Sequence, residues 1–292
     1  ADSTFYHYYL AKLPVSLSAM TPAMQGRSMC EIFGAFGWVE GIPMMKQLSD
    51  HMFSNGINYF VPHAFTPKFP DPDCPPHFYA GGQNPQFEAF GCLMQYMQRC
   101  AAMLSSGTPI APVGLLYTPQ AEWSGGNAML GQHVGKVLIQ NQLDYLLLWE
   151  DILSQATVEQ GKLLCHKQCF EVLVIPESQF LSDGMICALQ DFIDSGLTVI
   201  HIGQSDPTST SGRILTGCRH SDLQALPKLL REMGVGDISV SENHPYLRYH
   251  HRICDGKHLF FFHSEDYFNE IHCTVTLPGG PYRIYDPWND RL

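Results

Sequence analysis

The sequence predicts an α/β protein that ends in a short antiparallel β region, and three observations support this fold class. Through about residue 234, apolar runs of strand length alternate with amphipathic runs of helix length, as in parallel sheets covered by helices. From about residue 237 the runs become short and alternating, and Asp-Gly, Gly-Gly and Pro separate them. The 292 residues, 45% hydrophobic and 15% charged, suffice for one large or two ordinary globular domains.

The first region contains two strand-and-helix units and a long loop. The expected elements are a helix over residues 5–20 that begins or kinks at Pro14, a strand over 28–36, a helix over 43–56, a strand over 57–65, a loop over 66–86 and a helix over 85–107. Pro43 opens the second helix and Gly56 ends it. A proline-rich loop of this length is more often functional than not.

The second region continues the alternation of strands and helices. We expect strands over residues 111–118, 170–178 and 197–203, and helices over 133–156 and 182–196. Units of this length make an open, doubly wound sheet close to the flavodoxin-like layout. The stretch GLLYTPQAEWSGGN lacks GxGxxG spacing and the chain has no GxxxxGK[ST] pattern, so no nucleotide cofactor is expected.

The third region consists of short β segments. Strands are expected over residues 244–253, 257–265, 272–278 and 281–288. In the first of these, His250 and His251 alternate, which predicts that one points inward and the other outward.

Charge and composition exclude several partners. The formal charge is -11, from 28 acidic and 17 basic residues, and no Lys/Arg cluster occurs, so nucleic acid and anionic membranes are not expected partners. No apolar run approaches the ~20 residues that span a bilayer, and ADSTFYHYYL lacks a signal-peptide pattern. Ten scattered cysteines indicate reduced thiols of a cytoplasmic protein. Cys165, His166 and Cys169 lack a second ligand pair, so no metal site is expected.

One carboxylate, Glu31, lies in the apolar stretch SMCEIFGAFGW, where an unpaired buried charge would be costly. The residues alone leave three roles open: a buried ion pair, an exposed strand end, or contact with a substrate at the carboxyl end of a strand. Nearby aromatic rings such as Trp38 could stack on a sugar, and Gly34 and Gly37 allow a ligand to approach the backbone.

The stretches CEIFGAFGW, NYFVPHAF and PPHFYAGGQNPQF resemble the last third of the catalytic (β/α)8 barrel in modular bacterial glycoside hydrolases related to families 2, 42 and 106. The resemblance implies that Glu31, on the seventh barrel strand, is a catalytic carboxylate, the nucleophile or general base. It implies that His63 and Phe65, at the end of the eighth strand, contact substrate, and we add Trp38 and Phe78 as candidate sugar-stacking rings. The substrate would be an oligosaccharide or other glycoside.

The resemblance also divides the chain into domains. It implies a C-terminal barrel portion over residues 1–108, a flavodoxin-like domain over 109–234 similar to the trimerisation domain of family 42 β-galactosidases, and a β-rich segment over 235–292. A complete barrel needs about 250 residues, so the chain resembles a fragment. Its bare strands must pair with the flavodoxin-like sheet, with further sequence, or with a second copy in a homo-oligomer.

Glycoside hydrolysis needs a second carboxyl group, which the family supplies from a barrel strand that is absent here. Five acidic alternatives have a plainer interpretation as loop, turn or helix-surface charges; they are Glu40, Asp71, Asp73, Glu150 and Asp151. A sixth, Glu177, follows an apolar strand, at the carboxyl end where open α/β sheets bind ligands. A non-catalytic carbohydrate-binding or assembly module therefore remains the alternative function. A separate hydrolase with Ser178 as nucleophile would need an exposed hydroxyl at a tight turn.

Overall fold

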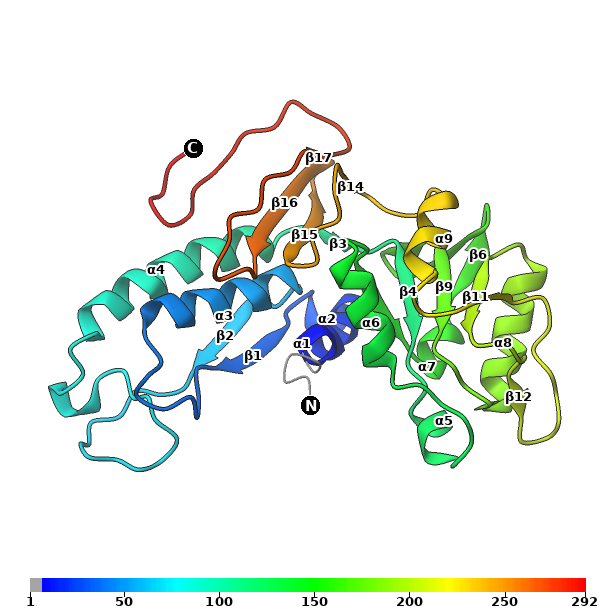
Figure 1. The fold of residues 1–292 in the computed structure, drawn as a ribbon, viewed down its shortest axis with the longest axis horizontal. Helices are drawn as coiled ribbons and strands as arrows, with labels where there is room; N and C mark the ends of the chain where they lie inside the picture. Colours follow the sequence, from blue (N-terminus) through cyan, green and yellow to red (C-terminus); the bar gives the residue numbers. More distant parts are fainter. Residues whose placement is uncertain (1–6) are drawn as a thin grey trace.

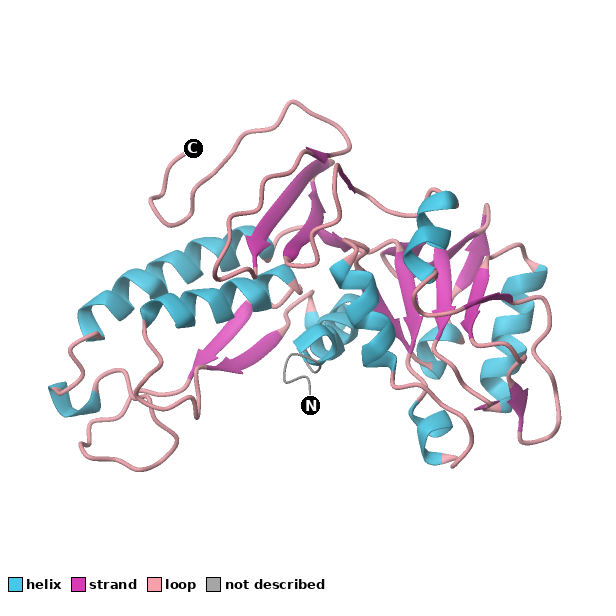
Figure 2. Cartoon of the chain, in the orientation of Figure 1, coloured by secondary structure: helices cyan, strands magenta, loops and turns pink. Residues whose placement is uncertain are grey.

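The computed structural model describes residues 7–292, so Phe5 and Tyr6 of the expected first helix lie outside the described residues. The chain forms two α/β halves joined by an antiparallel sheet (Figures 1 and 2). Helices α1 (His7–Leu10) and α2 (Lys12–Met20) are separated at Ala11, three residues before the start or kink expected at Pro14, and Pro14 lies in the first turn of α2.

The first half has a two-stranded parallel sheet covered on one side by two helices. Its elements are η1 (Pro22–Met24), β1 (Met29–Ile32), α3 (Ile42–Ser54), β2 (Tyr59–Pro62), η2 (Ala80–Gly82) and α4 (Phe87–Leu104). Strands β1 and β2 pair in parallel with Glu31 opposite Val61. Gly56, with φ of 101°, follows the end of α3 as the sequence predicts. Ile32, Phe53 and Leu93 lie in the core between these strands and helices.

The second half is built on five parallel strands. They are β4 (Val113–Leu116), β5 (Tyr145–Leu148), β9 (Val172–Ile175), β11 (Val199–Ile202) and β13 (Arg219–Ser221). Their spatial order is β13-β11-β9-β4-β5, and every neighbouring pair is parallel. Numbered along the chain this order is 2-1-3-4-5, which is the order of flavodoxin-like doubly wound sheets.

Helices cover both faces of this sheet, because successive strand side chains point to opposite sides. Leu115 and Leu147 face the core that contains α6 (Gly131–Gln140) and α9 (Leu226–Glu232). Leu116 and Leu148 face the opposite core, with α7 (Glu150–Leu153) and α8 (Asp183–Asp194). Figure 1 shows α6 and α8 on opposite sides of the strands.

The predicted helix over residues 133–156 is wrong, because α6, β5 and α7 occupy that span. The apolar run Tyr145–Leu148 is buried at every position, and a short buried run of this kind suits either a helix or a central strand. Smaller elements complete this half. They are α5 (Pro119–Trp123), β6 (Thr157–Glu159), β7 (Lys162–Cys165), β8 (Gln168–Phe170), β10 (Phe180–Leu181) and β12 (Thr208–Ser209).

An antiparallel sheet of order β16-β15-β3 joins the halves, with β3 (Thr108–Ile110), β15 (Leu247–Cys254) and β16 (Lys257–Ser264). Asp255 and Gly256 both have positive φ, as a two-residue hairpin turn with the right-handed strand twist requires. Strand β15 contacts both α3 and α6. His250 and His251 are 1% and 2% exposed, so the expectation of one outward histidine is wrong; the central strand is covered on both faces.

The C-terminal segment is less regular than predicted. Strand β14 (Ser239–Val240) pairs with β17 (Val275–Thr276), within the expected strand over 272–278, whereas residues 281–288 contribute only an isolated bridge from Asp286 to Arg291. Turn and proline residues interrupt this stretch, and Gly279 and Gly280 have positive φ.

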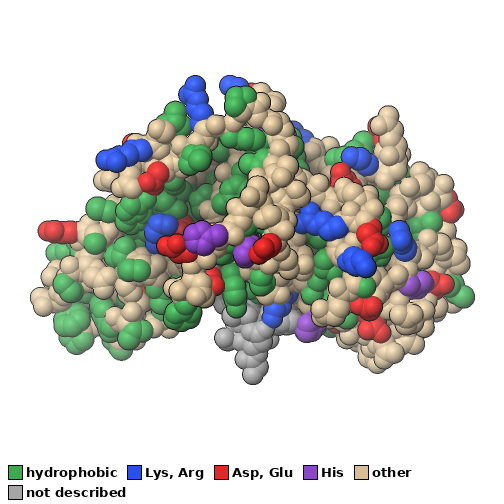
Figure 3. Space-filling model, turned by 45° about the horizontal axis from the view of Figure 1, so that its top comes forward, with side chains coloured by type: hydrophobic (Ala, Val, Ile, Leu, Met, Phe, Trp, Pro, Cys, Tyr) green, Lys and Arg blue, Asp and Glu red, His purple; other side chains and the backbone are tan. Residues whose placement is uncertain are grey.

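Hydrophobic side chains are unevenly distributed over the face shown in Figure 3. Hydrophobic side chains cluster over the half with α3 and α4, and charges of both signs are spread over both halves. Among residues 7–292, no helix is long and apolar enough to cross a membrane.

Candidate functional site

Glu31 lies on the uncovered face of the β1–β2 sheet. Side chains alternate along both strands: Met29, Glu31, Tyr59 and Val61 are exposed, whereas Ile32 faces the α3–α4 core. The Glu31 side chain is 67% exposed. The carboxylate therefore needs no buried partner, and of the three roles left open by the sequence, the buried ion pair is excluded.

The backbone directly after β1 is strained. Phe33 and Ala35 have φ of 78° and 68°, in the left-handed region that residues with a Cβ adopt rarely. Such conformations cost on the order of 1–3 kcal/mol each and concentrate at functional sites. Phe33 is held in place by burial, because its ring packs edge-on against Phe78 in the core.

His63 follows β2 and meets Glu31 across the two strands. Its Nδ1 atom lies 3.3 Å from Oε1 of Glu31. A Cβ at Gly34 would lie 3.2 Å from Cγ and Cδ2 of His63, so the glycine lets the imidazole pack directly on the chain after β1. Nε2 of His63 is buried and has no hydrogen-bond partner among the described residues.

A second histidine, from the proline-rich loop, and the predicted tryptophan, from the segment between β1 and α3, lie in the same place. The His77 ring lies 6.4 Å from the His63 ring, and its Nε2 atom is 2.6 Å from the carbonyl oxygen of Asp73. Trp38, 45% exposed, packs edge-on against His77 at 5.8 Å and Phe69 at 6.1 Å. Glu31, His63, His77 and Trp38 thus form one cluster, called here the Glu31 cluster.

The two predicted phenylalanines differ in exposure. Phe65 is 62% exposed and stacks on Tyr79 with ring centroids 5.1 Å apart, which leaves an accessible aromatic surface. Phe78 is 3% exposed and stacks on Phe90 at 3.9 Å. The expectation that Phe78 contacts substrate is therefore corrected: its ring belongs to the α3–α4 core.

Among the other carboxylates of the first half, Glu40 is unusual. Its plainer interpretation as a surface charge is wrong, because Glu40 is 2% exposed and neither carboxylate oxygen has a partner among the described residues. Burial raises the pKa of the Glu40 carboxyl to about 7. Asp71 instead shapes the loop, accepting hydrogen bonds from the backbone of Asp73 and the hydroxyl of Thr66, and the first of these lowers its pKa most.

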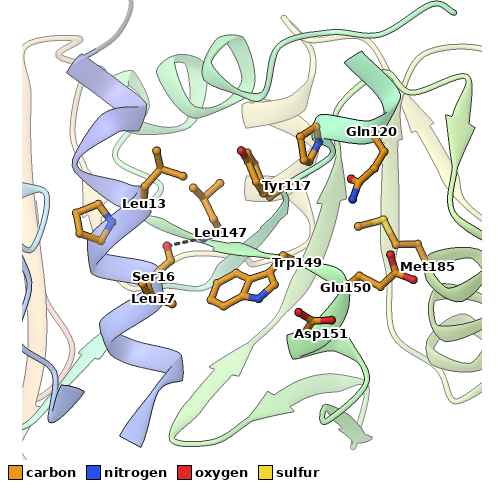
Figure 4. Close-up of a pocket in the computed structure, with 12 residues that line it drawn as sticks. Leu13, Ser16, Leu17, Tyr117, Gln120, Leu147, Trp149, Glu150, Asp151 and Met185 are labelled. Carbon is orange, nitrogen blue, oxygen red and sulfur yellow. Dashed lines mark hydrogen bonds between the residues drawn. The ribbon is translucent and has the colours of Figure 1, made fainter. Parts of the chain in front are cut away.

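A second candidate site lies at the carboxyl ends of β4 and β5, where open parallel sheets commonly bind ligands. A pocket of about 620 Å³ is bounded there by Tyr117, Gln120, Trp149, Glu150 and Asp151. Figure 4 shows that Leu13 and Leu17 of α2 form one wall of this pocket and that Gln120 and Met185 lie across from them. The hydroxyl of Ser16 accepts a hydrogen bond from the backbone of Leu147, which fixes α2 against β5.

Sequence reasoning missed the aromatic part of this pocket. It placed Glu150 and Asp151 on the surface of one long helix, whereas they begin α7 directly after β5. Trp149 and Tyr117 were not singled out, although each directly follows an apolar run of strand length. Their position after these apolar runs was the sequence signal that could have identified them as pocket residues.

Ser178, considered as a nucleophile, is completely buried, and its hydroxyl lies 3.4 Å from that of Thr118. A nucleophile needs an exposed hydroxyl, so the hypothesis that Ser178 is a nucleophile is contradicted.

The chain is similar in sequence and fold to glycoside hydrolases. A curated protein of Formosa agariphila, described as "Putative beta-glucuronidase", is 25% identical over 223 residues, covering 72% of this chain and 18% of that protein. A rhamnosidase structure from Novosphingobium sp. PP1Y matches with a TM-score of 0.66 at 14% identity, covering 86% of this chain and 27% of that chain. A beta-galactosidase from the psychrophilic Marinomonas ef1 matches with a TM-score of 0.55 at 12% identity, covering 86% and 53%.

No family model matches the chain. The chain spans 18% of the length of the curated relative and between a quarter and somewhat over half of the two solved structures. The resemblance to modular glycoside hydrolases that CEIFGAFGW and NYFVPHAF indicated is confirmed by these comparisons.

Proposed function

We propose that the chain is part of a modular glycoside hydrolase and that Glu31 is a catalytic carboxylate, the nucleophile or general base, acting on an oligosaccharide or other glycoside. One observation carries the proposal: β1 and β2 are parallel, helices cover one face, and the bare face carries Glu31 near the carboxyl end of its strand. In a (β/α)8 barrel, helices cover the outside and catalytic groups lie at the carboxyl ends of the strands.

In this proposal residues 1–108 are the last part of the barrel, residues 109–234 the flavodoxin-like domain and residues 235–292 the start of a β-rich domain. The bare face of β1 and β2 is then covered by further residues of a longer polypeptide. Alternatively, a second copy of the chain covers this face in a homo-oligomer. Sedimentation of the 292-residue chain distinguishes a monomer from an oligomer.

The Glu31 cluster supports the chemistry expected of this position. Glu31 is exposed enough to reach a substrate, and His63 at 3.3 Å holds the carboxylate from the neighbouring strand. Trp38 and Phe65 offer exposed rings for sugar stacking. The second carboxyl group comes from the rest of the polypeptide, at about 5–5.5 Å from Glu31 for a retaining enzyme or about 6.5–9.5 Å for an inverting one.

The test uses the native polypeptide, identified in the source organism from peptides of this chain. A panel of nitrophenyl glycosides is assayed with the native protein, with Glu31→Gln, and with the exposed control Glu159→Gln. We expect Glu31→Gln to lower kcat roughly 10²- to 10⁴-fold and the control to leave it unchanged. An unchanged kcat in Glu31→Gln, or a native mass near the 32.8 kDa of this chain, would overturn the catalytic proposal.

The second candidate function is a carbohydrate-binding or assembly module without catalysis, and the pocket of Figure 4 favours it. Trp149 supplies an aromatic surface, and Glu150, Asp151 and Gln120 supply hydrogen-bonding groups beside it. Calorimetric titration of the 292-residue chain with oligosaccharides tests this function. Trp123 is an exposed tryptophan outside the pocket lining and serves as the control. The binding function is supported if Trp149→Ala weakens binding and Trp123→Ala leaves it unchanged. It is contradicted if Trp149→Ala has no effect on binding.

A further inference from the structure

A cavity of about 430 Å³ opens at the carboxyl ends of β9, β11 and β13, and it shares no lining residue with the pocket of Figure 4. Its walls include Glu177, His201, Gly203 and Asp222, with Met129 and Leu223 as apolar neighbours. The carboxyl ends of parallel strands are where open α/β sheets hold ligands, and the volume falls in the range of about 300–1,000 Å³ typical of ligand pockets.

His201 presents an unused donor in this cavity. The residue is 2% exposed, and burial lowers the pKa of its imidazole to about 4, so the ring is neutral at pH 7. Nε2 accepts a hydrogen bond from the backbone N–H of Ser178 at 3.2 Å, so the single ring proton lies on Nδ1. Nδ1 is buried and has no partner among residues 7–292. A buried donor of this kind calls for an acceptor oxygen.

Glu177 and His201 both lie against Gly203 in the wall of this cavity. Gly203, with φ of 142°, approaches both side chains: a Cβ there would be 3.1 Å from Cε1 of His201 and 3.4 Å from Cγ of Glu177. The backbone N–H of Met129 donates to the carbonyl oxygen of Glu177 at 2.7 Å, and that of Gln179 donates to Asn127 at 2.7 Å. The wall that holds the carboxylate is therefore fixed by backbone hydrogen bonds.

The charges around the cavity limit the chemistry of its ligand. Glu177, Asp206 and Asp222 line it, and its lining contains no Lys or Arg, so an anion would be repelled. An ammonium group has no lone pair to accept the proton of His201. A hydroxyl group both accepts from His201 and donates to Glu177. Asp206 is already paired with His220 at 2.9 Å.

We propose that this cavity binds a neutral polyhydroxyl molecule of monosaccharide size, with hydroxyl groups between Nδ1 of His201 and the carboxylate of Glu177 and with carbon atoms against Met129 and Leu223. This site is independent of Glu31 and of the proposed hydrolysis. It assigns a binding role to the flavodoxin-like sheet itself.

The test follows the imidazole nitrogens of His201 by ¹⁵N NMR in the 292-residue chain. The probes are D-galactose, L-rhamnose and D-mannose, with D-glucuronate as a charged pyranose. We expect at least one neutral sugar to shift the Nδ1 signal with a Kd on the order of 1 mM. We expect D-glucuronate to bind at least tenfold more weakly, because its carboxylate faces Glu177 and Asp222.

Two variants make the outcome specific. Glu177→Gln should weaken the neutral sugar at least tenfold, and Gly203→Ala should weaken it by placing a Cβ against His201 and Glu177; Glu159→Gln is the exposed control. If the amide spectrum of Glu177→Gln shows that this variant does not fold, the proposal is tested by Gly203→Ala and by the comparison with D-glucuronate. No shift with any neutral sugar, or equal binding of D-glucuronate, overturns the proposal. Glu31→Gln should leave sugar binding at His201 unchanged, because Glu31 does not line this cavity. A failure of the catalytic proposal can therefore be distinguished from a failure of this one.

Discussion

Oε1 of Glu31 and Nδ1 of His63 lie 3.3 Å apart although 32 positions separate the two residues in the sequence. The parallel register of β1 and β2 produces this contact, because Glu31 is opposite Val61 and His63 follows two residues later. The strand ends thus hold a carboxylate and an imidazole together on the face that the helices leave bare.

His63 is a positioning residue for Glu31 in the proposed reaction. His63→Ala in the native polypeptide should lower kcat roughly 10²-fold with little change in KM, because the carboxylate loses the group that orients it. His63→Gln, which keeps a polar N–H group beside the carboxylate, should recover part of kcat. Steady-state kinetics on both variants make the measurement, and a His63→Ala enzyme with raised KM and normal kcat would instead assign the imidazole to substrate binding.

Phe78→Ala and Phe65→Ala should lower the free energy of unfolding by different amounts. Phe78→Ala removes a 3% exposed ring from the core and should lower the free energy of unfolding by about 3–5 kcal/mol. Phe65→Ala removes an exposed ring stacked on Tyr79 and should cost no more than about 1.5 kcal/mol. Urea unfolding of both variants compares them directly, and equal losses would contradict the burial difference.

Glu40 should make the protein less stable as pH rises from 4.5 to 7. Burial raises the pKa of this carboxyl from its usual 4.5 to about 7, so within this window the folded state keeps a proton that the unfolded state has released. The free energy of unfolding therefore falls across the window and levels off above pH 7. Glu40→Gln should remove this component and be more stable than the native chain at pH 8.

Urea unfolding at pH 5 and pH 8 measures the Glu40 effect. The exposed Glu159→Gln should keep the native dependence on pH. A Glu40→Gln chain with the native dependence would show that another group is responsible.

Glu265 should stabilise the junction between the halves. Burial opposes its charge, but the hydrogen bond with His51 and the Arg248 guanidinium, 2.5 Å away, together lower its pKa to about 2. Glu265→Gln leaves the 2% exposed Arg248 side chain without its anion, so the free energy of unfolding at pH 7 should fall by about 3–5 kcal/mol.

The Glu265 effect should depend on pH with the opposite sign to that of Glu40. The pKa is lowered on folding, so the stabilisation is complete above about pH 4.5 and is lost as pH falls towards 2. The difference between the native chain and Glu265→Gln should therefore shrink below pH 4.5. Glu270→Gln, whose ion pair with His272 is exposed, should change stability by less than about 0.5 kcal/mol.

The elements predicted correctly are those with strong local signals. The predicted strands over 111–118, 170–178 and 197–203 contain β4, β9 and β11, because each is an apolar run bounded by polar, glycine or proline residues. The run that forms β5 carried the same signal but followed α6 closely, with a turn at Gln142 whose φ is 50°. The antiparallel strands β6, β7 and β8 were missed, since each has only three or four residues, too few for a period to be recognised in the sequence.

The candidate site was predictable only where residues follow strands. Glu31 and His63 were singled out because they lie in or after apolar runs, and the strand register then brings them together. Burial of Glu40 and Phe78, and the lack of a partner for Nδ1 of His201 among residues 7–292, follow from packing that the local sequence does not encode.

By itself, the sequence determined the α/β class, the order of most elements and the resemblance to glycoside hydrolases, because apolar periodicity and turn residues act over short segments. Tertiary structure decided which face each side chain meets. Lys12 pairs with Asp144 in the buried interior, and Asp237 binds His251 at 2.7 Å, through contacts between distant segments. Such contacts depend on how strands and helices pack together, and packing is a property of the whole chain.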